Sequence, residues 1–279
     1  MSLVSELGLA VHDQFASGDA LLVGNGTVQR ASGFATPPAF RFSDGAESLT
    51  SALVDALPTG AIEFDRPVER IERVAGNVVV NTAGGSTTAA ALVLALPPSL
   101  AVSAGIVDPA TLDSAVADAA TQIPVWMGEI TKAVAVYERA FWRDLGLSGM
   151  VSALSEPFRE IHDMSGPDGS PSMLFGFGQA AGPSAPTADM FVQQLVALFG
   201  SDAASPVEVF ELDWSAEAFT TPAVGNGSER YELYGSPLLR TPSWGGRLHW
   251  ASTETGAVAP GHLEGALEAA ERTVRLLTA

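Results

Sequence analysis

The chain contains a single lysine, Lys132, and this residue stands in an apolar segment. Residues 129–138 include no glycine or proline and are rich in Val, Ile, Thr and Tyr, which predicts a β-strand. Because side chains alternate along a strand, Lys132 shares one face with Ile130, Val134 and Val136. Burial among aliphatic side chains disfavours the charge of an ammonium group and lowers its pKa.

Two interpretations of Lys132 stay open from this pattern. In the first, the aliphatic stem lies along its neighbours and the ammonium reaches water, which the strand alone favours. In the second, the ammonium points into a cavity, where an amine with a lowered pKa is a candidate functional group.

A second candidate lies near the C-terminus, in "RLHWASTETGAVAPGHLEGALEAAERTV", residues 247–274. The pattern predicts a strand, a polar loop, a glycine and then a helix that begins near Gly261 and His262. The beginning of a helix presents unpaired amides and a partial positive charge, and a glycine lets a ligand approach the backbone. The segment therefore predicts either an anion or phosphate site or an ordinary capped helix.

Other motifs do not indicate chemistry. Gly176, Gly178 and Gly182 resemble a glycine-rich dinucleotide loop, but Gly182-Pro183 and Pro186 interrupt the chain before a helix could begin. The histidines lack the spacing of metal ligands, so no metal site is predicted. Nor does the sequence carry a Gly-x-Ser-x-Gly or a Gly-x-x-x-x-Gly-Lys motif.

Composition narrows the class of protein. With 279 residues, 47% hydrophobic and 16% charged, the chain is expected to be globular. The formal net charge of −18 disfavours binding to nucleic acid and to anionic membranes. The absence of cysteine excludes disulfides and thiolate chemistry. We expect a cytoplasmic protein, because neither a signal peptide nor a transmembrane helix is indicated.

Hydrophobic patterns predict the elements that would position these residues. A hairpin is expected over residues 20–30 with its turn at Asn25-Gly26, and helices over residues 49–57 and 187–199. Further strands are expected over residues 64–74, 78–82, 91–96, 207–212 and 247–252. This mixture predicts a mixed α/β fold with an antiparallel region.

Two of these elements carry predictions about burial. The continuous apolar run of residues 91–96 predicts a strand that is covered on both faces. The buried stripe of the last helix is predicted to consist of Leu263, Ala266, Leu267, Ala270, Val274 and Leu277.

Five segments together resemble the flavin-containing amine oxidase family. The segments are "FDRPVERIE" (64–72), "LVLALPPSL" (92–100), "GEITKAVAVYERAFWRDLGLSG" (128–149), "ELDWSAEAF" (211–219), and "HWASTET" (249–255) followed by "GHLEGALEAAERT" (261–273). They occur in the family's order, so the resemblance extends over residues 44–279.

The resemblance implies a site for non-covalently bound FAD. Lys132 matches the family's lysine that reaches a water beside flavin N5, and His262 matches one of two aromatic residues that face the flavin. The residues implied to bind FAD are Val68, Pro97, Glu254, Thr255, Gly261 and Leu263.

The chain also departs from the family. The N-terminal strand–Gly-x-Gly-x-x-Gly–helix segment has no counterpart, and the position of the second aromatic residue falls near Val224. Ala223 stands where some members have a cysteine that binds the flavin covalently. In a doubly wound domain the missing strand is central, so we hypothesise completion by a complementary N-terminal polypeptide or by homo-oligomerisation.

The resemblance implies an incomplete Rossmann-like FAD-binding domain and an antiparallel-sheet substrate domain. We assign residues 1–100 and 245–279 to the first and residues 101–244 to the second. The implied function is an FAD-dependent oxidoreductase, truncated or split, that transfers hydride from a small amine to flavin N5 and is reoxidised by O₂. The alternatives are a non-catalytic remnant that binds a small ligand or a protein, and another flavoprotein reaction such as desaturation.

Overall fold

The computed structural model describes residues 2–34, 38–179, 185–222 and 230–279. The chain forms two compact units: the first contains Met1–Ile62 and Ile130–Asp213, and the second contains Glu63–Glu129 and Trp214–Ala279. These boundaries differ from the expected domains, since the first 62 residues join the central segment of the chain rather than the C-terminal helix. Each unit is described by itself.

The first unit is built around a large sheet. Its elements are α1 (Ser2–Glu6), β1 (Val11–Asp13), β2 (Asp19–Gly24), β3 (Thr27–Ala31), β4 (Phe40–Phe42), α2 (Glu47–Asp55), β9 (Ile130–Tyr137), α5 (Phe141–Asp144), β10 (Leu147–Ala153), β11 (Phe158–Asp163), β12 (Ser172–Gln179), α6 (Ala188–Phe199), η2 (Ser201–Ala204) and β13 (Glu208–Asp213).

The large sheet has seven strands in the order β13-β9-β12-β11-β10-β2-β3. All neighbouring strands are antiparallel except β10 and β2, which are parallel. The predicted hairpin is β2–β3, and Asn25 and Gly26 both have positive φ at its turn, as a two-residue hairpin turn requires. The predicted antiparallel region is therefore confirmed.

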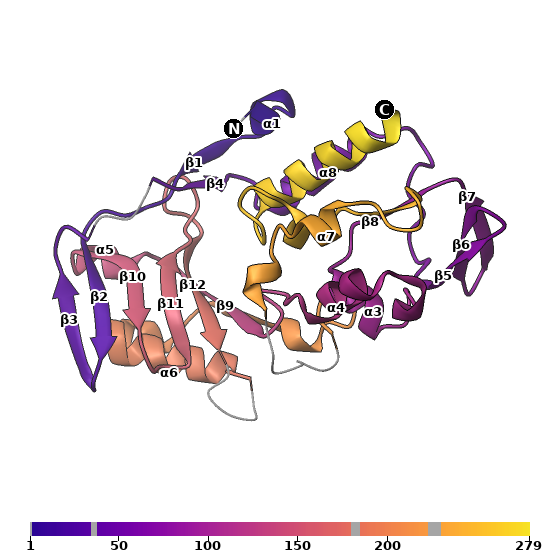
Figure 1. Ribbon diagram of the computed structural model, residues 1–279. Helices are drawn as coiled ribbons and strands as arrows, with labels where there is room; N and C mark the ends of the chain where they lie inside the picture. Colours follow the sequence, from indigo (N-terminus) through magenta and orange to yellow (C-terminus); the bar gives the residue numbers. More distant parts are fainter. Residues whose placement is uncertain (1, 35–37, 180–184, 223–229) are drawn as a thin grey trace. The chain divides into compact units, whose positions relative to one another are not determined.

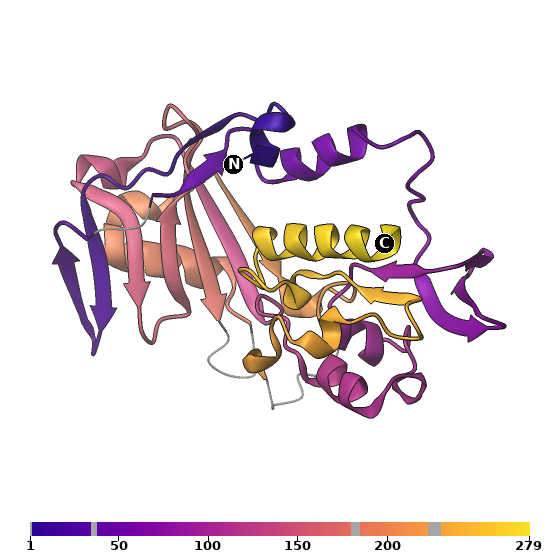
Figure 2. The same cartoon turned by 45° about the horizontal axis from the view of Figure 1, so that its top comes forward.

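Helix α6 covers one face of this sheet, as Figures 1 and 2 show. Its buried residues Phe191 and Leu195 belong to the same hydrophobic cluster as Ala133 and Ala135 of β9. Thr187 caps the beginning of α6 by accepting a hydrogen bond from the Met190 amide. Along β9 burial alternates strictly, which confirms the strand predicted around Lys132.

Packing explains the glycines of β12. A Cβ atom on Gly176 would lie 2.5 Å from the Phe191 ring, and one on Gly178 would lie 2.9 Å from the Phe158 ring. Both glycines lie inside a strand, so they make room for aromatic side chains. Because Gly176 and Gly178 lie inside β12, they do not form a dinucleotide-binding loop, as expected from the sequence. Gly182, the third glycine of that pattern, lies outside the described residues.

The second unit combines a small meander, a parallel strand pair and several helices. Its elements are β5 (Val68–Val74), β6 (Asn77–Thr82), β7 (Gly85–Ala89), β8 (Leu92–Leu94), α3 (Pro98–Ser103), η1 (Pro109–Thr111), α4 (Ser114–Gln122), η3 (Trp214–Ala216), η4 (Tyr231–Leu233), α7 (Pro237–Arg240), β14 (Leu248–Trp250), η5 (Thr253–Thr255) and α8 (Leu263–Thr278).

Strands β5, β6 and β7 form an antiparallel sheet, whereas β8 and β14 pair in parallel. A second hydrophobic cluster joins them and includes Leu94 of β8, Trp250 of β14 and Val78 of β6. Parallel strands are normally found in larger sheets that are covered on both faces, so a two-stranded parallel sheet is unusual.

Two predictions about burial in this unit are wrong. Val93, in the middle of β8, is 41% exposed, so this strand is not covered on both faces. The residues that α8 buries are Gly265, Ala269, Arg272 and Thr273, and not the predicted apolar stripe. The hydrophobic pattern identified an amphipathic helix correctly, but the small and polar side is the one that packs onto the unit.

Within the described residues, none of the helices combines the length and the apolar character needed to cross a membrane. The same residues contain no cluster of three or more histidine, aspartate or glutamate side chains suited to a metal ion.

Candidate active site

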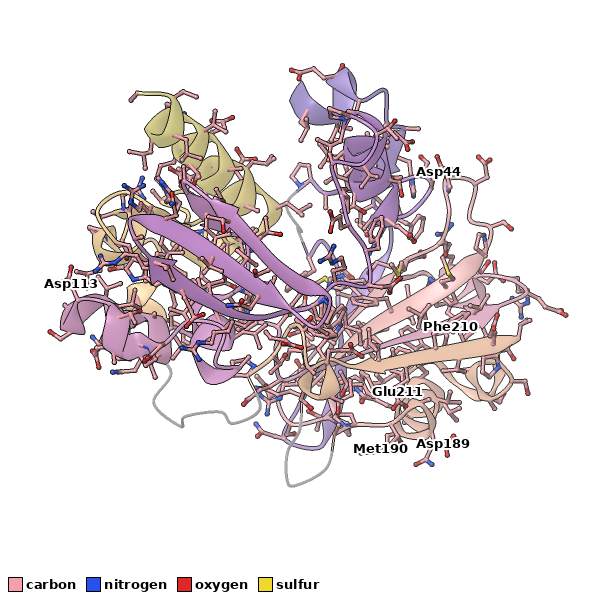
Figure 3. All side chains as sticks on the ribbon, turned by 90° about the vertical axis from the view of Figure 1, so that its right-hand side faces the viewer. Asp44, Asp113, Asp189, Met190, Phe210 and Glu211 are labelled. Carbon is pink, nitrogen blue, oxygen red and sulfur yellow. The ribbon has the colours of Figure 1, made fainter. Side chains whose placement is uncertain are left out.

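Lys132 lies on the face of the large sheet that is opposite α6. Its Cα pairs with Phe177 of β12 on one side and with Leu212 of β13 on the other. The next pair along the face is Phe175 and Phe210, and Phe210 is labelled on β13 in Figure 3. Phe210 is 52% exposed and Leu212 is 41% exposed, so this side of the sheet presents apolar and aromatic surface around one ammonium group.

The environment of Lys132 changes its protonation equilibrium. Its Nζ atom lies 6.0 Å from the centroid of the Phe177 ring, and the side chain is half-buried. Burial lowers the pKa of Lys132 from its ordinary value. A lysine with a lowered pKa releases its proton more readily than one in water. Snorkelling along the apolar face has the same geometry.

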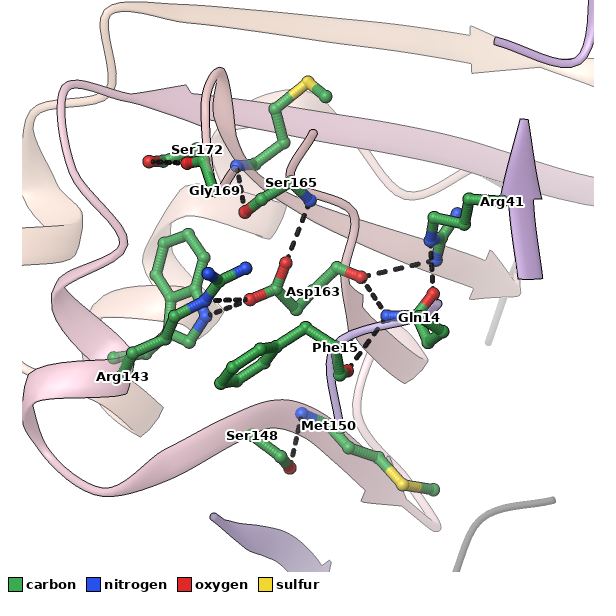
Figure 4. A network of polar contacts seen from close by, with 12 residues as sticks. Gln14, Phe15, Arg41, Arg143, Ser148, Met150, Asp163, Ser165, Gly169 and Ser172 are labelled. Atoms are coloured by element: carbon green, nitrogen blue, oxygen red, sulfur yellow. Dashed lines mark hydrogen bonds and ion pairs between the residues drawn. The ribbon is translucent and has the colours of Figure 1, made fainter. Parts of the chain in front are cut away.

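A polar network supports the opposite end of the same sheet (Figure 4). The buried Asp163 accepts hydrogen bonds at Oδ2 from Trp142 Nε1 and from Arg143 Nε, each at 2.8 Å, and at Oδ1 from the Ser165 amide at 2.9 Å. The Arg143 guanidinium lies 3.8 Å from the centroid of the Phe15 ring. Both carboxylate oxygens are satisfied, so this cluster fixes the fold and presents no free reactive group.

In the second unit, two loops leave the same edge of the parallel strand pair. Because β8 and β14 run in the same direction, Pro97 after β8 and η5 after β14 both follow the carboxyl ends of their strands. Ligands of open α/β sheets bind at the carboxyl ends of the strands. Val68, at the beginning of β5, packs against the hydrophobic cluster of this unit.

The beginning of α8 is joined to η5. Thr253 Oγ1 donates a hydrogen bond to the His262 carbonyl at 2.6 Å, and the Gly261 amide donates to the Thr253 carbonyl at 3.4 Å. His262 occupies the N-cap position, but its side chain makes no capping hydrogen bond. Leu263, the first helical residue, is 62% exposed. The first-turn amides therefore lack a side-chain cap, which is the condition for an anion site at a helix N-terminus.

Glu254 and Thr255 of η5 are both buried. Burial raises the pKa of Glu254, and hydrogen bonds from Ser252 and from its own amide partly oppose the rise. Among the described residues, Glu254 Oε2 has no hydrogen-bond partner. The Thr255 hydroxyl donates to the Ser252 carbonyl at 2.8 Å, so this side chain is used within the fold. Of these two side chains, the carboxyl group of Glu254 is the one with an oxygen available for a further polar contact.

The rings of Trp126 and His262 lie in contact. Trp126 was not among the site residues predicted from the sequence. The two rings lie 4.6 Å apart between centroids at an interplanar angle of 50°. A Cβ atom on Gly261 would lie 3.1 Å from Trp126 and 3.3 Å from the Tyr234 ring, so a side chain at this position would press on both aromatic residues. Its position two residues before "GEITK" is the sequence signal that could have drawn attention to it.

Arg272 is buried, although an arginine four residues after a glutamate on a helix usually forms a surface ion pair. Its guanidinium donates to the Trp250 carbonyl at 2.7 Å and to the Thr255 carbonyl at 2.7 Å, so α8 is fastened to the end of β14 and to η5. Arg272 also forms an ion pair with Glu268 at 3.8 Å. Glu268 is itself partly buried, and it also contacts Arg240 at 3.2 Å and accepts a hydrogen bond from the Ala257 amide at 2.9 Å.

The structure thus groups most of the predicted site residues. Glu254, Thr255, Gly261, His262 and Leu263 lie together at η5 and the beginning of α8, all in the second unit. Pro97 and Val68 belong to the same unit, while Lys132 belongs to the first. Ala223 and Val224, where the resemblance places the covalent cysteine and the second aromatic residue, lie outside the described residues.

Comparison with protein families gives a match over almost the whole chain. Residues 8–278 match the family described as flavin containing amine oxidoreductase. The chain belongs to this family, which confirms the resemblance seen in the sequence.

Individual relatives of the chain are also named as flavin-containing amine oxidases. AofH of Mycobacterium tuberculosis, whose name places it with the flavin-containing monoamine oxidases, is 30% identical over 240 residues, covering 83% of this chain and 51% of AofH. Flavin-containing amine oxidase B of Sus scrofa is 28% identical over 254 residues, covering 84% of this chain and 46% of that protein. The chain therefore spans about half the length of the curated relatives it matches.

Solved structures confirm the fold. Putrescine oxidase in complex with putrescine superposes with a TM-score of 0.82 at 18% identity, covering 100% of this chain and 85% of that chain. Cyclohexylamine oxidase from Brevibacterium oxydans gives a TM-score of 0.78 at 20% identity, covering 99% of this chain and 85% of that chain. The mixed α/β architecture predicted from the sequence is thus confirmed.

Proposed function

We propose that this chain is part of an FAD-dependent oxidoreductase that oxidises a small amine. The observation that carries this proposal is the family match over residues 8–278. When bound, FAD would supply the acceptor for hydride from the amine carbon, and O₂ would reoxidise it. The names of the relatives, monoamine oxidases and oxidases of putrescine and cyclohexylamine, support an amine as the substrate class.

The second unit has features that fit the cofactor. The N-terminal amides of α8, which no side chain caps, are suited to a pyrophosphate group. The loops after β8 and β14 follow the carboxyl ends of parallel strands, where such ligands bind. Glu254 Oε2, buried without a hydrogen-bond partner among the described residues, is an acceptor that a ligand hydroxyl or N–H could satisfy. We therefore propose Val68, Pro97, Glu254, Thr255, Gly261 and Leu263 as contacts of non-covalent FAD.

We propose that Lys132 manages a proton or a water molecule in the reaction. Burial lowers its pKa, so its Nζ atom can be both donor and acceptor closer to neutral pH than an exposed lysine. The apolar face around it, with Phe175 and Phe177, limits the water that reaches the nitrogen. His262 is proposed to contribute an aromatic wall together with Trp126.

The visible spectrum of the purified protein, with and without added FAD, tests the cofactor proposal. Absorption bands of bound oxidised flavin support the enzyme. Their absence at saturating FAD would favour the second candidate, a non-catalytic module that binds a small ligand or a protein.

The observation that favours this candidate is the half-length coverage of the relatives, which also motivates a complementary polypeptide or a homo-oligomer. The cytoplasmic location stays a prediction from the sequence.

Lys132→Met tests the role of the amine in a preparation that binds flavin. We expect peroxide formation to slow by about 100-fold, since general acid–base groups typically contribute a factor of about 100 or more. The matched control is Val134→Met, which places the same side chain on the same face without removing an amine. An unchanged rate in Lys132→Met would remove the proposed role.

A further inference from the structure

A bulge in β11 brings a carboxylate to the face of the large sheet that carries Lys132. The register between β11 and β12 shifts between Phe158 and Glu160, so Arg159 is an extra residue on β11. Without the bulge, strand alternation would place Phe158 and Glu160 on the same face. Phe158 is buried against Phe191 of α6, and the bulge therefore places Glu160 on the face opposite α6.

Three side chains form one row across this face of the sheet. Glu160 of β11 pairs with Phe177 of β12, and Phe177 pairs with Lys132 of β9. Residues that pair across antiparallel strands lie side by side on one face. Two strand spacings of about 4.8 Å each separate Glu160 from Lys132, which is about 10 Å in total. The row therefore places an aromatic ring between a carboxylate and an amine.

The carboxylate of Glu160 is held by a neighbour and is still accessible. His162 Nε2 lies 2.6 Å from Glu160 Oε1, and the Glu160 side chain is 54% exposed. The two oxygens of a carboxylate offer about four acceptor positions, so one imidazole nitrogen does not use all of them. An exposed pair of this kind contributes little to stability. Its placement in the row of Lys132 therefore points to a ligand rather than to the fold.

Aromatic rings form the surface between the carboxylate and the amine. The rings of Phe175 and Phe177 lie 4.5 Å apart between centroids at an interplanar angle of 85°, and both side chains are half-buried. On the neighbouring strands Phe175 pairs with His162, so these rings share the face of the row described above. Methylene groups gain free energy when they leave water for such a surface. A ligand with an apolar chain can therefore lie between Glu160 and Lys132.

We propose that Glu160 binds a second ammonium group of the substrate, so that the preferred substrates are diamines whose methylene chain lies on Phe175 and Phe177. An aliphatic ammonium group has a pKa similar to that of lysine, about 10.4, so the amine that does not react is charged at neutral pH. Its N–H groups form charge-assisted hydrogen bonds to the carboxylate. This inference rests on the proposed function and names the substrate class of that function, but its first test needs no flavin.

The first test measures binding of hexamethylenediamine to the purified chain without FAD, by isothermal titration calorimetry. Glu160→Gln keeps the size of the side chain and removes its charge. We expect the Kd to rise by about tenfold or more, because a hydrogen bond to a charged group is lost. The matched control is Glu208→Gln, the same substitution at an exposed position of β13, where we expect a change of less than about twofold because distant exposed charges are screened. Circular dichroism verifies that both variants are folded.

The second test uses a preparation that binds flavin. Glu160→Gln should raise the KM for hexamethylenediamine by about tenfold with kcat unchanged, and should leave the KM for hexylamine, which lacks the second ammonium, within about twofold. No binding of the diamine by the unchanged chain, an equal Kd in Glu160→Gln, or an equal rise in KM for both amines would each overturn the inference. Binding that depends on Glu160 in a chain that takes up no flavin would instead overturn the proposed function and leave the ammonium site in place.

Discussion

The two units of this chain bury their hydrophobic residues to different extents. In the first unit, α6 lays Phe191, Leu195 and Phe199 on the large sheet and buries all three. In the second unit, α8 is longer, yet it buries Gly265, Ala269, Arg272 and Thr273 and exposes its leucines at positions 263, 276 and 277. Two amphipathic helices thus obey the same sequence rule and orient their apolar sides differently. The difference teaches that amphipathicity specifies a face to be covered, and not the partner that covers it.

The largest expected effect is in the first unit. Leu195→Ala on α6 removes a fully buried side chain from the hydrophobic cluster. We expect a loss of about 2–5 kcal/mol in the free energy of unfolding, from lost burial and from the cavity that remains. Urea unfolding followed by circular dichroism measures it. A loss as small as that of an exposed leucine would mean that α6 is not seated on the sheet as described.

The polar network of the same unit gives the next effect. Asp163→Asn keeps the shape but removes the charge that Trp142, Arg143 and the Ser165 amide share. We expect a loss of about 2–3 kcal/mol, because buried hydrogen bonds to a charged group would be weakened and donors left unpaired. The control is Asp202→Asn, whose pair with Arg139 is exposed and is expected to contribute less than about 1 kcal/mol. Equal losses in the two variants would contradict the network.

Two glutamates of the second unit are expected to make the free energy of unfolding depend on pH in opposite directions. Despite the opposing effect of burial, the Ala257 amide, Arg240 and Arg272 lower the pKa of Glu268, so its stabilising contribution is present above the ordinary glutamate pKa and is lost as pH falls through the lowered value. Burial raises the pKa of Glu254, so folding is penalised as pH rises from the ordinary value through the raised one.

Glu268→Gln should therefore destabilise the chain by about 1 kcal/mol at neutral pH, with a difference that shrinks toward acid. Glu254→Gln should become relatively more stable as pH rises. Thermal unfolding of both variants and of the unchanged chain, between acid and neutral pH, measures how each difference in stability changes with pH. Slopes of the same sign would show that one of the two carboxyl groups does not have the surroundings described.

The smallest expected effect is the counterpart of the first. Leu277→Ala on α8 makes the same substitution at a position that is 46% exposed. We expect a change within about 0.5 kcal/mol in the isolated chain, since little burial is lost. If the change approached that of Leu195→Ala, Leu277 would already be covered and the contrast between the units would disappear.

Much of the fold could be predicted from the sequence. Alternation in residues 129–138 identified β9, and Asn25-Gly26 identified the hairpin β2–β3, because these signals act over a few neighbouring residues. The second unit resisted prediction where burial depends on distant neighbours. The apolar run of β8 and the apolar residues of α8 both indicated covered faces, and nothing in their own residues indicates which side the rest of the unit covers.

The residues of the candidate site were likewise predictable where the signal is local, and not where it depends on distant residues. Gly261 and His262 were found because a glycine before an amphipathic helix is a local signal. Trp126 was missed because it meets His262 across 136 positions of sequence, and the contacts of Arg272 with Trp250 and Thr255 depend on how α8 folds back over β14. An arginine four residues after a glutamate predicts an ion pair on the helix surface. Tertiary packing is what buries Arg272 and lets it join α8 to the backbone of β14 and η5.

The solitary lysine has a practical consequence. A protease specific for lysine can cut the chain at one peptide bond only, between Lys132 and Ala133. That bond lies in the interior of β9, which is hydrogen-bonded to β12 on one side and to β13 on the other. Cleavage into two fragments must wait until these strands separate, so its rate would report the opening of the sheet without any label.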